Sequence, residues 1–257
     1  MKRKCRAKHY IIDMDGVVYR GKSMIPGADH FVECLETLGR KFLFLTNSSD
    51  STPVDLQKRL SVMGIEVNVQ SFYTSALATA AFLQSQKPAG KAFVLGESGI
   101  EQALLEVGYT LTDEDPDYVV LGETQNYEFS KITTAIRLID RGVRFIATNP
   151  DVTGPFDGGI IPACGAFAAL IEKATGRVPY FIGKPNPLMM RKALRTLNAH
   201  STETAIIGDR MDTDILAGTE SGMETILVLS GVTDPEDLVK YPYRPDFIFD
   251  SIADIEP

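Results

Sequence analysis

The chain has 257 residues, of which 44% are hydrophobic and 23% are charged, and its formal net charge is −8. This composition is typical of a globular protein, and the length is near the size at which one core gives way to two domains. The acidic balance disfavours nucleic acid polymers and anionic membranes as partners, whereas local cations can still recognise a small anionic substrate.

The cysteines and the apolar segments of the sequence indicate no zinc ribbon, disulfide framework, secretory signal or membrane span. Cys5, Cys34 and Cys164 lie far apart and form no CxxC pair, so neither a zinc ribbon nor a disulfide framework is expected. The basic first ten residues lack an apolar core, so no secretory signal is expected. No run approaches the ~18 apolar residues that cross a bilayer. These observations predict a cytoplasmic protein.

The first predicted element is a buried strand at 10–12 that ends in two acids, Asp13 and Asp15, with Gly16 directly after them. In open α/β sheets, ligands bind at such carboxyl ends of strands. Two carboxylates there are costly unless a cation or a partner charge stabilises them. The alternative interpretation is a strand end with solvated acids.

The next elements follow the order of a parallel sheet. A helix is expected at 26–39, a strand at 41–45 that ends in Thr46 and Asn47, and a helix from Thr52-Pro53 to Gly64. The strand–helix alternation predicts parallel strands with right-handed crossovers.

The middle of the chain repeats the alternation on its own. Strands are expected at 93–95, 118–121 and 144–147, and helices at 99–107, 128–141 and 164–175. About a hundred residues with their own strands and helices suffice for a second domain.

The last third resumes the first pattern. A strand at 181–182 leads to Gly183-Lys184-Pro185 and a helix capped by Asn186. A strand at 204–207 ends in Gly208-Asp209 and precedes a short helix at 212–221. Strands at 225–229 and 247–249 complete the sheet. We therefore predict an α/β protein with a discontinuous core, 1–78 plus 182–257, and an inserted domain at 79–181.

Polar residues follow four of these strands, and a parallel sheet would bring them to one edge. Together they supply what phosphoryl transfer needs: a carboxylate nucleophile, a proton carrier, donors for phosphate oxygens and a lysine. Oxygen-only ligands favour Mg²⁺ over zinc. The residues are Asp13, Asp15, Thr46, Asn47, Lys184, Asp209 and Asp214.

Two neighbouring features have simpler interpretations. Lys184 precedes a proline and lacks the upstream glycine of a Walker A loop, so a P-loop is excluded. Asp212 fits a solvated helix N-terminus better than a metal ligand.

The motifs Asp13-x-Asp15-Gly16, Thr46-Asn47, Gly183-Lys184-Pro185 and Gly208-Asp209 with Asp214 resemble the four motifs of the haloacid dehalogenase (HAD) superfamily. The insertion resembles the C2-type cap of subclass IIA. The segments 73–83, 120–124, 144–151, 162–166, 183–187 and 224–232 resemble the NagD branch of ribonucleotide monophosphatases. The resemblance implies a Rossmann-like parallel HAD core with an inserted α/β C2 cap.

The resemblance also implies catalytic roles. Asp13 would be the nucleophile and a metal ligand. Asp15 would protonate the leaving group and activate water, and its main-chain carbonyl would touch Mg²⁺. Asp209 would complete the set of protein ligands to the metal. Asp214 would not bind the metal itself but would orient the residues of the site.

Substrate contacts follow from the same resemblance. Thr46 and Asn47 would bind the transferring phosphate, and Lys184 would neutralise it. Asn149 and Asp151, which follow a predicted strand of the cap, would face the leaving group. For each of these two residues the alternative is a structural turn.

The leading hypothesis is a Mg²⁺-dependent phosphomonoesterase that dephosphorylates nucleoside monophosphates, such as UMP, through an aspartyl phosphate. One alternative is a HAD phosphatase for sugar phosphates or other small phosphate esters such as phosphoglycolate. A non-catalytic binding protein on a phosphatase fold is disfavoured by the complete set of acids and Lys184. A phosphotransferase or mutase is disfavoured by the large cap.

Overall fold

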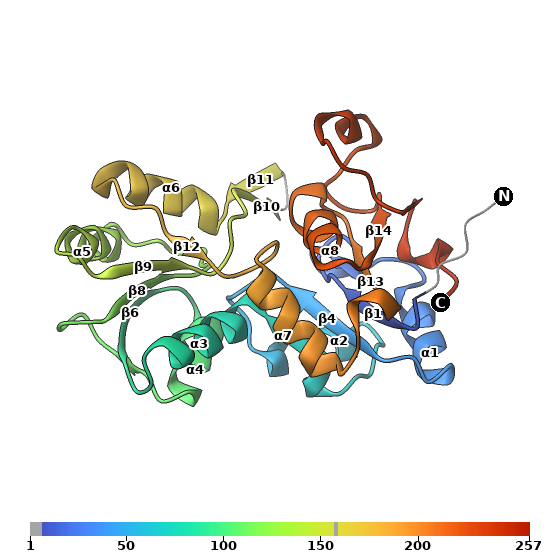
Figure 1. Ribbon diagram of the computed structural model, residues 1–257, viewed down its shortest axis with the longest axis horizontal. Helices are drawn as coiled ribbons and strands as arrows, with labels where there is room; N and C mark the ends of the chain where they lie inside the picture. Colours follow the sequence, from blue (N-terminus) through green and yellow to red (C-terminus); the bar gives the residue numbers. More distant parts are fainter. Residues whose placement is uncertain (1–6, 157–158) are drawn as a thin grey trace. The chain divides into compact units, whose positions relative to one another are not determined.

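The computed structural model describes residues 7–156 and 159–257, and it divides into two compact units. Unit 1 comprises residues 1–46, 56–73 and 184–257, and unit 2 comprises 47–55 and 74–183. Each unit contains its own parallel sheet with helices, as Figure 1 shows. The domain bounds expected from the sequence, at 78/79 and 181/182, stay a prediction.

The sheet of unit 1 has six strands in the order β15-β14-β13-β1-β4-β5, and the pairs from β15 to β4 are parallel. In its centre Ile12 lies opposite both Ile207 and Phe44. The strands are β1 (His9–Ile12), β4 (Phe42–Thr46), β5 (Phe72–Thr74), β13 (Thr204–Gly208), β14 (Glu224–Val228) and β15 (Phe247–Phe249).

Three of the expected helices of this part of the chain are found within two residues of their expected signals. Asn186 caps one of them, since its side chain accepts a hydrogen bond from the Leu188 main chain, and Pro187 occupies the first turn. The helix expected at 212–221 is instead a π-helical turn, η3 (Met211–Ile215), followed by a shorter α-helix. The α-helices are α1 (Ala28–Thr37), α2 (Pro53–Val62), α7 (Pro187–Leu197) and α8 (Leu216–Ser221).

The smaller elements here are turns and one hairpin, which the sequence did not predict. They are β2 (Tyr19–Arg20), β3 (Ser23–Met24), η1 (Val69–Ser71), η2 (Ser201–Glu203), η4 (Pro235–Lys240) and η5 (Ile252–Asp254).

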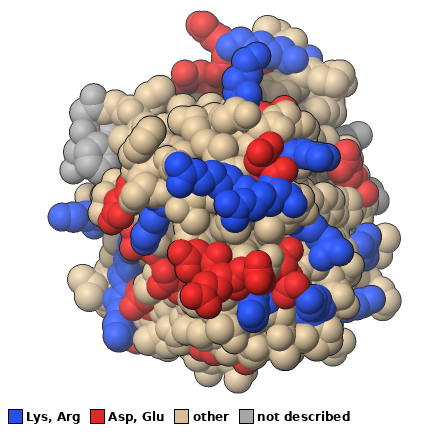
Figure 2. All heavy atoms as spheres, turned by 90° about the vertical axis from the view of Figure 1, so that its left-hand side faces the viewer, with Lys and Arg blue, Asp and Glu red and all other residues tan. Residues whose placement is uncertain are grey.

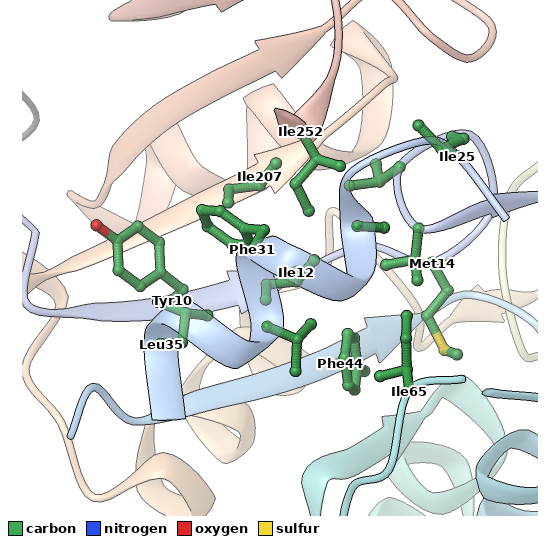
Figure 3. Packing of buried hydrophobic residues seen from close by; sticks show 14 of the residues in the cluster. Tyr10, Ile12, Met14, Ile25, Phe31, Leu35, Phe44, Ile65, Ile207 and Ile252 are labelled. Carbon is green, nitrogen blue, oxygen red and sulfur yellow. The ribbon is translucent and has the colours of Figure 1, made fainter. Parts of the chain in front are cut away.

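The core of unit 1 lies between helix α1 and the centre of the sheet. Figure 3 shows Phe31 and Leu35 of α1 beside Tyr10 and Ile12 of β1. The rings of Tyr10 and Phe31 meet edge to face, with centroids 5.8 Å apart. This packing holds the two central strands, β1 and β13, whose carboxyl ends carry the acids.

The sheet of unit 2 has five strands in the order β12-β9-β8-β6-β7, all of them parallel. The strand expected at 181–182 begins one residue earlier and belongs to this sheet, where Phe181 lies opposite Ala147. The strands are β6 (Lys91–Leu95), β7 (Thr110–Leu111), β8 (Tyr118–Leu121), β9 (Arg144–Ala147) and β12 (Tyr180–Phe181).

Four helices and a hairpin complete unit 2. Cys164, Ala168 and Ile171 of one helix pack with Val119 and Phe145 of the sheet. The helices are α3 (Ser75–Gln86), α4 (Ser98–Glu106), α5 (Phe129–Asp140) and α6 (Cys164–Thr175), and the antiparallel hairpin is β10 (Thr153–Phe156) with β11 (Gly159–Pro162).

The surface carries charges of both signs. Figure 2 draws the left-hand side of Figure 1 and shows a short band of lysine and arginine side chains next to a cluster of acids. Within the described residues, no helix has both the length and the apolar character that a membrane span requires.

Candidate active site

Two acids follow directly on the paired central strands of unit 1. Asp13 comes after β1, and its main-chain N–H still donates to the carbonyl of Ile207 on β13, at 2.9 Å. Asp209 comes after β13. Both side chains are buried, with 8% and 2% of their residue surfaces exposed. The parallel register therefore brings two buried acids to one edge, as the sequence predicts.

Lys184 lies between two carboxylates. Its Nζ is 2.7 Å from Asp13 Oδ1 and 2.7 Å from Asp214 Oδ1, and it donates to the carbonyl of Leu45 at 3.2 Å. Burial alone would lower the pKa of Lys184, but the two carboxylates raise it overall. The lysine is therefore a fixed positive charge beside Asp13.

Asp13, Asp209 and Asp214 together place carboxylate oxygens within 4.8 Å of one another. We call these three residues and Lys184 the acid cluster. With all groups ionised it has a formal charge of −2. Burial raises the pKa of Asp13 well above its usual range, and Asp214 adds to the effect. Burial, then Asp214, raise the pKa of Asp209 to about 7. Such carboxylates ionise readily only when a further cation is bound.

The donor set of the acid cluster fits Mg²⁺. The donors are carboxylate oxygens, and no histidine or cysteine joins them among the residues the structure describes. Both carboxylate oxygens of Asp214 accept hydrogen bonds, one from Lys184 and the other from the main-chain N–H of Arg210 at 3.2 Å. Asp13 and Asp209 are then the carboxylates best suited to hold the ion, and the expected metal ligands Asp13, Asp15 and Asp209 stay a prediction.

Glycines leave room around Asp209. Gly16 has φ +78°, and a Cβ there would lie 2.5 Å from Asp209 Oδ2. A Cβ at Gly231 would lie 1.9 Å from the same oxygen. The main-chain N–H of Val232 donates to Asp209 Oδ2 at 2.6 Å. Two loops thus close on this carboxylate and fix its direction.

Asp15 lies three residues after β1, and Thr46 is the last residue of β4, which pairs with β1. Asp15 is partly exposed, pairs through its backbone with Tyr19, and contributes no carboxylate to the acid cluster. Burial and then the charge of Asp15 raise the pKa of Tyr19. Thr46 is the buried last residue of β4. Asp212 is exposed and pairs with Arg210, at 3.1 Å, as expected for a solvated acid.

The other predicted residues gather in unit 2. Asn47 Nδ2 donates to Asp151 Oδ2 at 3.0 Å, and Asn149 Nδ2 donates to the main-chain carbonyl of Asn47 at 2.8 Å. Asn149 is fully buried. Three residues that the sequence analysis predicts to contact substrate are thus joined to one another by hydrogen bonds.

Sequence reasoning missed two members of this group, Glu123 and Ser49. Glu123 Oε1 accepts from Asn149 Nδ2 at 3.1 Å, and Oε2 accepts from the main-chain N–H of Ser49 at 3.3 Å. Burial, then Asp151 and Asp50, raise the pKa of Glu123 to about 8. An acid a few residues after a buried strand is the same kind of signal that singled out Asp15. We call Asn47, Ser49, Glu123, Asn149 and Asp151 the Asn47 cluster.

Comparisons with known proteins agree with this geometry. The family model described as haloacid dehalogenase-like hydrolase matches residues 10–110, and the one described as HAD-hydrolase-like matches 181–255. Ribonucleotide monophosphatase NagD from Escherichia coli (strain K12) is 45% identical over 97% of this chain and 98% of its own length.

The chain belongs to the NagD family of haloacid dehalogenase-like hydrolases.

Further relatives in this family differ in the substrates that their names state. A dihydroxyacetone phosphatase from Corynebacterium glutamicum (strain R) is 54% identical over 96% of this chain and 90% of its own. An acid sugar phosphatase from Staphylococcus aureus (strain USA300) is 39% identical over 97% and 98%. The solved structure of NagD from E. coli K-12 superposes with a TM-score of 0.90 at 44% identity, over 98% of this chain and 99% of that one. The predicted α/β fold, with a parallel HAD core sheet and a second parallel cap sheet, is thereby confirmed.

Proposed function

We propose that this NagD-family protein is a Mg²⁺-dependent phosphatase that hydrolyses small phosphate monoesters through an aspartyl phosphate on Asp13. The observation that carries the proposal is the acid cluster, in which a buried lysine pairs with Asp13 while two further carboxylates stand within 4.8 Å. Membership of the family supports it, since the relatives described above are all named phosphatases.

In the first step the Asp13 carboxylate attacks phosphorus, and the ester P–O bond breaks. Asp15 donates its proton to the departing alkoxide. Thr46 and Asn47 bind the phosphoryl oxygens, and Lys184 offsets the negative charge that these oxygens bring beside Asp13.

In the second step water attacks the phosphorus of the aspartyl phosphate. Asp15, now a carboxylate, takes the proton from this water, and the bond between phosphorus and the Asp13 oxygen breaks. Inorganic phosphate leaves, and both aspartates return to their starting states. Mg²⁺ held by Asp13, Asp209 and the main-chain carbonyl of Asp15 would supply charge neutralisation for the phosphate and the buried carboxylates.

For the substrate, we favour three-carbon phosphate esters of the dihydroxyacetone phosphate type. The supporting observation is that the relative named for this substrate shares 54% of its residues with this chain. Nucleoside monophosphates, the class first expected from the sequence, are the second candidate, because NagD of E. coli shares 45%.

A panel of phosphate esters tests both levels of this proposal. Purified protein with Mg²⁺ is given dihydroxyacetone phosphate, a hexose phosphate, UMP and an aryl phosphate, and phosphate release is measured. We expect turnover of the aryl phosphate and the highest kcat/KM for dihydroxyacetone phosphate. A higher kcat/KM for UMP would favour the second candidate, and no release from any ester would refute a phosphatase.

A further inference from the structure

Hydrogen bonds tie the residues after β4 to the carboxyl ends of β8 and β9. Asn149 Nδ2 donates both to the Asn47 carbonyl, at 2.8 Å, and to Glu123 Oε1, at 3.1 Å. The Glu123 main-chain N–H donates to Ser49 Oγ at 2.8 Å, and Glu123 Oε2 accepts from the Ser49 N–H at 3.3 Å. One acid therefore contacts both ends of the segment 47–49, at Ser49 directly and at Asn47 through Asn149.

Other bonds leave this segment little freedom. The Asn47 carbonyl also accepts from the hydroxyl of Ser75, so both of its lone pairs are used. The side chain of Asn47 donates to Asp151, whose main-chain N–H donates to Asn149 Oδ1 at 3.1 Å. Ser49 and Asn149 are fully buried. Because these bonds are buried or partly buried, removal of one partner leaves the donors and acceptors of the others unsatisfied.

The charge state of Glu123 suits this place. Asp151 and Asp50 face it from two other segments, and the thiol of Cys164 and the phenol of Tyr127 are further ionisable neighbours. Burial and these acids keep the carboxyl group protonated at neutral pH. An ionised carboxylate here would place a negative charge beside the residue expected to bind a phosphate dianion.

We propose that Glu123 is a positioning residue, which holds Asn149 and Ser49 and thereby fixes Asn47 in the conformation that binds phosphate. The inference rests on the proposed function only through the role of Asn47. Glu123 itself contacts no substrate in this account, and its effect appears in phosphate affinity.

The test compares Glu123→Ala and Glu123→Gln with Glu97→Ala, an exposed acid of the same unit that lies outside the cluster. The measurements are KM and kcat for an aryl phosphate and the inhibition constant of inorganic phosphate. We expect Glu123→Ala to raise KM and the inhibition constant about tenfold, with a smaller change in kcat. Glu123→Gln keeps a neutral group and an acceptor for Asn149, but its NH2 group cannot accept from the Ser49 N–H, so it should raise both constants less than Glu123→Ala does. Glu97→Ala should stay within about threefold of wild type at pH 7.

A pH series adds a readout that a merely structural role would not move. As Glu123 ionises above about pH 8, KM of the wild type should rise relative to that of Glu123→Gln. If Glu123→Ala does not fold, Ser49→Ala, which removes the acceptor of the Glu123 N–H, should still weaken inhibition by phosphate several-fold.

Unchanged phosphate inhibition in Glu123→Ala, or in Ser49→Ala where the former does not fold, would overturn the inference. So would a ratio of KM values that does not vary with pH. In either case an active wild type and an inactive Asp13→Asn leave the proposed function intact. An inactive wild type, by contrast, would refute the proposed function itself.

Discussion

The acid cluster and the Asn47 cluster bury polar groups in opposite ways. In the acid cluster three carboxylates surround one lysine, so that charge remains to be neutralised. In the Asn47 cluster two amides, a hydroxyl and the carboxyl groups of Glu123 and Asp151 are joined by hydrogen bonds. The first arrangement fits a bound cation, whereas the second ties the segment 47–49 to the residues after β8 and β9.

This difference separates chemistry from positioning. Changes in the acid cluster should alter the bond-breaking steps and the binding of the ion. Changes in the Asn47 cluster should alter affinity and stability.

Asp13→Asn should abolish turnover, with a loss on the order of 10⁴-fold or more, because the amide cannot attack phosphorus. Phosphate release from an aryl phosphate measures the loss. Asp212→Asn is the matched control, since Asp212 is an exposed acid near the same edge and should retain activity. Comparable activity in the two variants would show that Asp13 is not the nucleophile.

Chelation with EDTA should eliminate activity, and Mg²⁺ should restore it, because the buried carboxylates need a cation. Ca²⁺ should fail to restore activity, since it prefers longer bonds and more ligands than Mg²⁺. The assay is phosphate release after removal of EDTA and addition of each metal. Full activity in EDTA, with no metal found by elemental analysis, would exclude this role of the acid cluster.

Lys184→Met should destabilise the protein by about 3 kcal/mol at pH 8 in EDTA, because Asp13 and Asp214 lose their buried partner. The loss should shrink at pH 5, because burial raises the pKa of Asp13 well above its usual range and lets this carboxylate take up a proton. Urea unfolding of both proteins at the two pH values measures it. A pH-independent difference would mean that the lysine contributes packing alone.

Glu123→Gln should stabilise the protein at alkaline pH. The folded-state pKa of Glu123 is about 8 against an ordinary value of 4.5, so the folded state holds a proton that the unfolded state has lost. Stability of the wild type therefore falls as pH rises from about 4.5 to 8, and glutamine removes this loss. We expect a gain of about 1 to 3 kcal/mol at pH 8.5 and little change at pH 5. Equal urea midpoints at both pH values would show that Glu123 is not held neutral.

Local patterns predicted the acids and the strands that carry them. A short apolar run followed by Asp13, or by Asp209, is visible in the sequence, and parallel pairing of neighbouring strands then brings both to one edge. The helix 164–175 was predicted with the bounds that the structure has.

Features that depend on distant contacts could not be predicted in this way. The pairing of Lys184 with both Asp13 and Asp214, and the bond from Asn149 to Glu123, join residues far apart in the chain. Strand β7 and hairpin strands β2 and β3 have two residues each, which is too short to show an alternation of apolar and polar residues. The π-helical turn at Met211–Ile215 contains Asp214, whose side chain bonds to the distant Lys184, and no local propensity signals this turn.

The variant Asp15→Asn tests directly whether a covalent phosphoryl intermediate forms on Asp13. This variant keeps the nucleophile but lacks the group that activates water, and an aryl phosphate leaves without protonation. Rapid-quench mass spectrometry should therefore find a phosphoryl group on Asp13 that hydroxylamine removes, and none in Asp13→Asn. A phosphoryl group on another residue, or turnover retained by Asp13→Asn, would contradict the account.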